Sequence, residues 1–209
     1  MPLQNRVDPY GQLHAVGARG AWMGNRGVLH NSAREIVSPW RSPRWITCVL
    51  RSKGIRREVF APHGYSELFF LDEATSLAAG HRPCAECRRD RFKEFCDAWA
   101  TSSGGARVSS HPVRAGEIDR VLHAERVRRQ GEKKTYEAAP SSLPPGTMIE
   151  REGRAFLSWG GRLRAWSFSG YGRAVEVPPR TKVKVLTPRS IVRTIRSGFV
   201  PQVHESGGR

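Results

Sequence analysis

The chain has 209 residues, of which 38% are hydrophobic, and its 35 Lys and Arg against 19 Asp and Glu give a formal net charge of +16. There is no run of about 18 apolar residues that would span a membrane, and Met1–Asn25 lacks the apolar core of a secretory signal, so we expect a soluble cytoplasmic protein. The basic excess favours a polyanionic partner, with nucleic acid first among the candidates.

The N-terminal third of the chain alternates between irregular and β-favouring segments. Residues 1–27 are rich in Gly and Arg with little periodicity, which predicts an irregular segment. The run Trp45–Leu50 predicts a short strand. It is followed by the basic loop Arg51–Arg57, in which Lys53 and Gly54 form a turn signal.

Two helices are predicted around a pair of cysteines. Asp72 is a good N-cap and Gly80 a good residue to follow a helix, so we predict a short helix over Glu73–Ala79. After Cys84 and Cys87 a second helix follows, with apolar side chains at a spacing of three to four residues. They are Phe92, Phe95, Cys96 and Trp99.

The remainder of the chain changes from helical to strand-and-turn character. Glu117–Gln130 predicts a helix with one apolar face, and the polar stretch to Pro145 a connector. Short strands are expected at Thr147–Glu150, Ala155–Trp159, Leu163–Phe168 and Thr181–Leu186. A helix is expected to follow through Ile195, with Thr187 as its N-cap and Pro188 as its first residue. We therefore expect an α+β protein with a zinc-knuckle strand and helix module over residues 28–131 and a small β-rich module with a C-terminal helix over residues 146–204.

The spacing Cys84-x-x-Cys87 at a helix start is half of a structural zinc site. Four cysteines in an intracellular chain of this size fit metal binding better than a disulfide framework. Cys48, in the strand upstream, is the third predicted ligand. For the fourth we predict His30. The alternatives are His63 as runner-up, then His81 and Cys96.

The segment Leu68–Arg89 resembles the metal-binding domain of the Ada-type DNA repair proteins. The matching positions are Phe69, Phe70, Ala78, Ala79, Gly80, Arg82, Pro83, Cys84, Cys87 and Arg88, and a looser likeness extends over residues 28–95. That family holds zinc with four cysteines, two of them in an upstream C-x-x-x-C pair, one of which accepts methyl groups from DNA. This chain has Cys48 alone upstream. The resemblance therefore implies a zinc scaffold with a DNA-facing surface rather than a methyl acceptor.

Charge and resemblance together predict a zinc-stabilised nucleic-acid-binding protein, with DNA favoured over RNA and a role in repair or in the recognition of modified DNA. The residues expected to contact phosphates are Arg56, Arg57, Arg82, Arg88 and Arg89. One alternative is a metal-dependent nuclease or hydrolase in which Asp119 and His123, four residues apart on a predicted helix, do the chemistry. Another is a ribosome- or RNA-associated protein.

Overall fold

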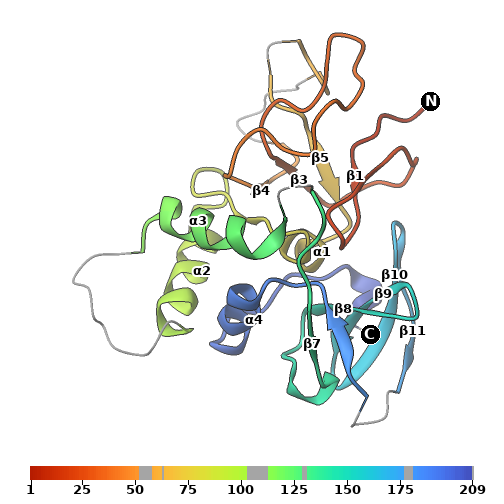
Figure 1. Ribbon diagram of the computed structural model, residues 1–209, viewed down its shortest axis with the longest axis vertical. Coiled ribbons are helices and arrows are strands. Elements are labelled where there is room, and N and C mark those ends of the chain that lie inside the picture. The colour runs from red at the N-terminus through yellow and green to blue at the C-terminus, as the bar shows by residue number, and fades with distance from the viewer. Residues whose placement is uncertain (52–57, 63, 103–112, 129–130, 177–180, 209) are drawn as a thin grey trace.

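A computed structural model describes residues 1–51, 58–62, 64–102, 113–128, 131–176 and 181–208. They form four α-helices and two six-stranded sheets, the α+β class expected. The strands of the first sheet lie in the upper part of Figure 1 and those of the second at the lower right, with α1 (Glu73–Ala78) between them. No helix in the described part of the chain is long and apolar enough to cross a membrane.

The first sheet has the strand order β2-β1-β5-β3-β4-β6. Its strands are β1 (Arg6–Val7), β2 (Leu13–His14), β3 (Trp22–Asn25), β4 (Ile46–Cys48), β5 (Leu68–Phe70) and β6 (Arg82–Pro83). The pairs β1–β5 and β4–β6 are parallel, and the other neighbours are antiparallel. β4 lies within the predicted strand at Trp45–Leu50.

The expectation that residues 1–27 are irregular is wrong. Three strands of the first sheet lie there, and β3 sits between β5 and β4. These strands have two to four residues each and carry no clear period of their own. They form because β5 and β4, much further along the chain, supply their hydrogen-bond partners, as in the register Met23 with Phe69 and with Cys48.

The second sheet is antiparallel throughout, with the order β11-β10-β9-β8-β12-β7. Its strands are β7 (Tyr136–Ala138), β8 (Thr147–Arg151), β9 (Arg154–Trp159), β10 (Arg162–Ser167), β11 (Gly170–Val175) and β12 (Val183–Val185). The four predicted strands are present as β8, β9, β10 and β12. β7 and β11 were not predicted, because each is short or Gly-containing and adds to an edge of the sheet.

The helices join the two halves of the chain in shared cores. The remaining three are α2 (Arg89–Ser102), α3 (Ala115–Arg126) and α4 (Arg189–Arg196). One cluster packs Leu77 of α1 with Phe95 of α2, Leu122 of α3 and Ile191 of α4. A second packs Ala74 and other residues around α1 against β8, β9 and β11. Residues 146–204 therefore share two core clusters with the first module, while a further cluster, which includes Ile149, Leu163 and Val192, lies wholly within residues 136–192.

The short helix α1 is fixed at both ends in the way that the sequence predicts. The Asp72 carboxylate accepts hydrogen bonds from the Thr75 backbone N–H at 2.8 Å and from the Tyr171 hydroxyl at 2.7 Å. At the other end Gly80 has φ = +91°, which favours glycine. A Cβ there would lie 2.6 Å from Cδ of Arg126, so this glycine also allows the close approach of α3.

Candidate metal centre

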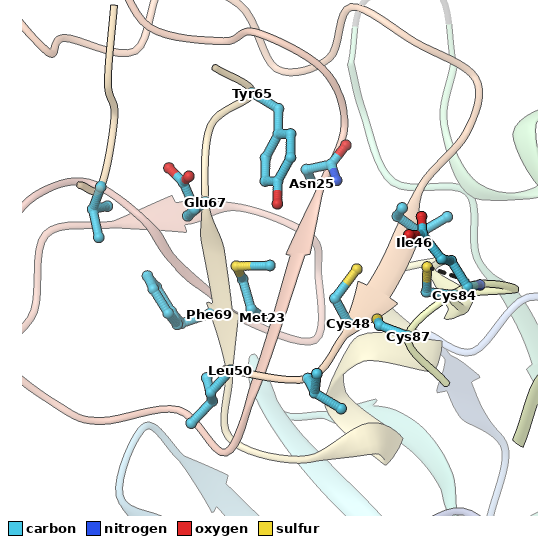
Figure 2. A pocket seen from close by; sticks show the side chains of 13 residues that line it. Met23, Asn25, Ile46, Cys48, Leu50, Tyr65, Glu67, Phe69, Cys84 and Cys87 are labelled. Carbon is cyan, nitrogen blue, oxygen red and sulfur yellow. Dashed lines mark hydrogen bonds between the residues drawn. The ribbon is translucent and has the colours of Figure 1, made fainter. Parts of the chain in front are cut away.

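Three cysteine thiols meet where two parallel strands end. Cys48 closes β4, Cys84 directly follows β6, and the register Thr47 with Pro83 places the two cysteines side by side. The Cys84 backbone N–H continues this pairing by donating to the Thr47 carbonyl at 2.9 Å. Cys87 lies one turn further, shortly before α2, and its sulfur faces the other two (Figure 2).

The separation of the three sulfurs fits a metal ion. All three Sγ atoms lie within 4.8 Å of one another. Two thiolates bound to one tetrahedral zinc at Zn–S distances of about 2.3 Å would be about 3.8 Å apart. A small inward movement of the sulfurs therefore suffices for coordination. Three cysteines that the sequence singled out are thus brought together in a group that can hold a metal ion.

The electrostatics of the group favour thiolate at its centre. The Glu86 backbone N–H donates to Sγ of Cys84 at 3.5 Å. A side-chain hydrogen bond from Cys48 lowers the pKa of Cys84 to about 5, and the same contact raises the pKa of Cys48. Burial raises the pKa of Cys87. A cation is the partner that would allow all three to lose their protons.

The three cysteines line one side of a pocket of about 240 Å³. Its other walls include Asn25 and Met23 of β3 and the side chains of Tyr65 and Glu67 (Figure 2). Sequence reasoning missed these wall residues, because they come from the loop before β5 and from the unpredicted strand β3. Glu67 accepts a hydrogen bond from the Phe60 backbone N–H at 2.9 Å, which fixes one of its carboxylate oxygens.

His30, the predicted fourth ligand, lies outside the cysteine group. Its Nδ1 is 2.6 Å from Oγ of Ser66, its Nε2 is 3.2 Å from the Ala61 carbonyl oxygen, and its ring stacks on Phe60. Both ring nitrogens thus have partners already. The position across from Cys48 is taken by Met23, because the strand paired with β4 on that side is β3.

The other candidates for the fourth ligand are also placed elsewhere or not described. Nε2 of His81 accepts from Nε of Arg26 at 3.3 Å, and Cys96 packs against the helical core. Burial raises the pKa of the Cys96 thiol to about 11. His63 lies outside the described residues. Among the residues that the structure describes, the group has three members.

Asp119 and His123 do not form the catalytic pair that the nuclease alternative requires. The Asp119 carboxylate is buried and accepts from Nε and Nη2 of Arg82 at 2.9 and 2.8 Å. Nδ1 of His123 is 3.0 Å from Nη2 of Arg126. Each side chain is hydrogen-bonded to a different arginine. The four-residue spacing puts both on one face of α3, where they meet Arg82 of β6 and Arg126 of α3 itself, which are both buried.

Two of the five arginines predicted to contact phosphate are buried. Arg82 pairs with Asp119, and Arg88 donates to Glu73 at 2.7 Å and stacks on Trp22 at 3.8 Å. They hold β6 and the start of α2 in place around the cysteines. Arg89 is exposed, and Arg56 and Arg57 lie outside the described residues.

Basic side chains do converge elsewhere on the surface. Arg128 after α3, Lys134 and Arg189 of α4 are exposed and line a pocket of about 360 Å³. Glu125 in the same pocket is held by the Ser190 backbone N–H and hydroxyl, both at 2.8 Å. The pocket therefore presents three cations from three segments of the chain.

In comparisons with known proteins, no family model, no curated protein and no solved structure matches this chain.

Proposed function

We propose that this chain is a zinc-stabilised nucleic-acid-binding protein, with DNA as the preferred partner. The observation that carries the proposal is the convergence of three thiols in a chain of net charge +16. Thiolate ligands select zinc over hard cations such as Mg²⁺ and Ca²⁺, which prefer oxygen. The strong basic excess favours a polyanion.

The chain's own residues give the metal a structural role. Cys48 belongs to the first sheet, whereas Cys87 leads into α2. Bound zinc would supply a cross-link between these elements. The buried ion pairs Arg82–Asp119 and Arg88–Glu73 stabilise the same segment, because Arg82 lies in β6 before Cys84 and Arg88 directly follows Cys87. Bound zinc would thus hold structural elements together. A structural role also agrees with the presence of Cys48 alone where the Ada-type proteins have a cysteine pair that includes the methyl acceptor.

The zinc part is tested by metal analysis of the purified protein. We expect about one zinc per chain, lost in Cys84→Ser and retained in Cys96→Ser. Cys96 is the matched control, because it is a half-buried thiol outside the group. Zinc retained at full stoichiometry in Cys84→Ser, or none in the wild type after expression with added zinc, would contradict the site.

For the nucleic acid we place the phosphate contacts on the exposed cations, Arg89 and the trio Arg128, Lys134 and Arg189. Arginine forks and lysine ammonium groups bind backbone phosphates without reading the sequence, which suits a sequence-tolerant binder. Arg82 and Arg88 are left out of this set since carboxylates already neutralise them.

The binding part is tested by fluorescence anisotropy with labelled duplex DNA over a range of salt concentrations. Changing Arg128, Lys134 and Arg189 together to Gln should weaken binding and flatten the salt dependence, by about 0.9 in log–log slope for each phosphate that the variant no longer neutralises. The matched control changes Arg154, Arg162 and Arg173, exposed on the second sheet, to Gln. Equal loss in both triple variants would refute this surface. Tighter binding of RNA of the same length would refute the preference for DNA.

A further inference from the structure

A small cavity near the start of β4, at the opposite end of this strand from Cys48, is lined by basic side chains. It measures about 110 Å³ and is lined by Arg26, Arg126, Lys133, Trp40, Trp45 and Gly11, with further residues. These come from the segment after β3, the end of α3, the bridge that follows it, the approach to β4 and the turn between β1 and β2. Parts of the chain far apart in sequence thus build one positively charged site.

The two arginines are almost wholly buried, with 1% and 0% of Arg26 and Arg126 exposed. Arg26 donates from Nη1 to the Gly11 carbonyl at 2.8 Å and from Nε to His81 at 3.3 Å. Arg126 donates from Nη1 to the Gly80 carbonyl at 2.8 Å and from Nη2 to the Pro43 carbonyl at 2.6 Å. Backbone carbonyls and the imidazoles of His81 and His123 hold both guanidinium groups in fixed positions.

Two donor nitrogens in this site have no partner. Nη2 of Arg26 and Nε of Arg126 are buried and make no hydrogen bond to any residue that the structure describes. Both guanidinium groups also stack on Trp45, with their central carbons 4.0 Å from its ring. Since the ring restricts their rotation, neither group can turn its free donor to another acceptor at little cost.

Three basic side chains meet here without a direct ion pair among the described residues. None of the ion pairs found there includes Arg26, Arg126 or Lys133. The ammonium of Lys133 donates to the Ala78 carbonyl. Glu132 also lines the cavity, but its carboxylate lies 4.0 Å from Arg128.

Burial lowers the pKa of Arg26 and of Arg126 to about 9 and that of Lys133 to about 7. Asp119 opposes, without cancelling, the lowering of the Arg126 pKa by burial. Asp8 opposes the lowering by burial of the pKa of Arg26 and of Lys133, but its carboxylate lies 2.8 Å from Nε2 of His14.

Carbonyl partners alone leave such a site unfavourable. A buried charge without a counter-charge costs several kcal/mol even after relaxation. Arg82 and Arg88, equally buried in the same protein, each have a carboxylate at 2.7–2.8 Å. Arg26 and Arg126 have no carboxylate paired with them in this way, which favours a counter-charge supplied from outside the chain.

We propose that this cavity binds a phosphate-sized oxyanion between Arg26, Arg126 and Lys133. A cavity of about 110 Å³ admits one tetrahedral oxyanion but not a whole nucleotide, so the ligand is inorganic phosphate or a single terminal phosphate group. The free Nη2 and Nε donors, together with the Lys133 ammonium, suit the several oxygens of such an anion.

The anion site is separate from the cysteine group. Trp45 precedes β4 and Cys48 ends it, so the two sites lie at opposite ends of one strand, about 10 Å apart by the strand rise. The side chains differ too, with guanidinium and ammonium groups at one end and thiols at the other. The proposal therefore stands without the proposed zinc or nucleic-acid binding.

The test is titration of the metal-replete protein with inorganic phosphate, followed by calorimetry and by thermal unfolding at constant ionic strength. We expect saturable binding and a rise in Tm that equivalent chloride does not produce. Arg26→Met should weaken binding about 10- to 100-fold, the loss expected for a charge-assisted hydrogen bond. Arg154→Met, an exposed arginine on β9, should leave it unchanged.

Should Arg26→Met fail to fold, Lys133→Met is the second variant, because it removes one cation and leaves the Trp45 stack intact. It should lose phosphate affinity while keeping or gaining stability in phosphate-free buffer. Equal effects of phosphate and chloride, or unchanged phosphate affinity in the folded variant, would overturn the proposal.

The source of the anion is resolved with short oligonucleotides that carry either a 5′-phosphate or a 5′-hydroxyl. A preference for the phosphorylated end that disappears in Lys133→Met identifies a terminal phosphate of nucleic acid. Equal binding of both, together with saturable binding of inorganic phosphate, identifies a free oxyanion. Either result supports the site, and absence of both effects refutes it.

Discussion

Asp119→Asn is the change that best separates a structural from a catalytic role for this residue. The carboxylate forms two parallel hydrogen bonds to Arg82, at 2.9 and 2.8 Å, and both side chains are 4% exposed. Arg82 lies in β6, two residues before Cys84, and its guanidinium carbon is 5.1 Å from the ring centre of Phe92 in α2. The pair therefore ties α3 to the strand that carries the cysteines.

Asparagine keeps the shape of the side chain but removes its charge, so Arg82 becomes a buried cation without a counter-charge. Breaking a buried ion pair in this way costs about 3–5 kcal/mol. The asparagine oxygen still accepts one hydrogen bond, which favours the lower end of that range. For a chain of this size, a loss of about 3 kcal/mol lowers Tm by about 6–12 °C. In Arg82→Met/Asp119→Leu no charge is left unpaired, and most of the stability should return.

The assay is urea unfolding followed by tryptophan fluorescence, at fixed metal concentration. Asp97→Asn, the same substitution at an exposed position of α2, is the control and should change stability by less than about 0.5 kcal/mol. Stability of Asp119→Asn equal to that of the control would refute the structural reasoning. So would a double variant that is less stable than the single one. Metal-dependent DNA cleavage abolished by Asp119→Asn without loss of stability would restore the nuclease alternative.

Three further outcomes are expected. Tyr171→Phe removes the hydroxyl that donates to the buried Asp72 at 2.7 Å, and should cost about 1–3 kcal/mol in urea unfolding. Burial, then Arg26 and Arg126, lower the pKa of Lys133 from 10.5 to about 7, against a smaller opposing effect of Asp8. Between these two pH values the unfolded chain therefore holds the Lys133 proton and the folded chain does not. In phosphate-free buffer the stability of the wild type relative to Lys133→Met should therefore rise with pH through that window, by at most about 1.4 kcal/mol per pH unit. Acidification should release the metal as the thiolates protonate, measured with a coloured chelator, and to the same extent in Cys96→Ala.

The sequence predicted those helices and strands whose ends are marked by capping or turn residues within the element itself. Asp72 and Gly80 delimit α1 within one residue, and four of the six strands of the second sheet appear where expected. Thr187, expected to cap α4, does not do so: its Oγ1 accepts the Met148 backbone N–H at 2.9 Å, and Pro188 occupies the cap position. The Thr187 hydroxyl therefore bonds to a strand distant in the sequence instead of capping the helix that follows it.

The three thiols were predictable because the Cys-x-x-Cys pair is local and a single cysteine remained upstream in a strand. What joins them is the parallel pairing of β4 with β6, whose residues are far apart in the sequence. The assignment of arginines to phosphate depended on knowing which are buried. Arg82 and Arg88 find their carboxylates 37 and 15 residues away, so no local pattern marks them as internal.

The net charge of the chain therefore has two distinct meanings. Four arginines that count toward the basic excess, Arg26, Arg82, Arg88 and Arg126, are at most 6% exposed and do not contribute to a docking surface. Arg82 and Arg88 form direct ion pairs with carboxylates, and Arg26 and Arg126 do not. An argument from net charge to nucleic acid must consequently depend on exposed cations such as Arg128, Lys134 and Arg189. Arg26 and Arg126, both stacked on Trp45 and without a directly paired carboxylate, are the basis for proposing that a small anion binds inside the protein.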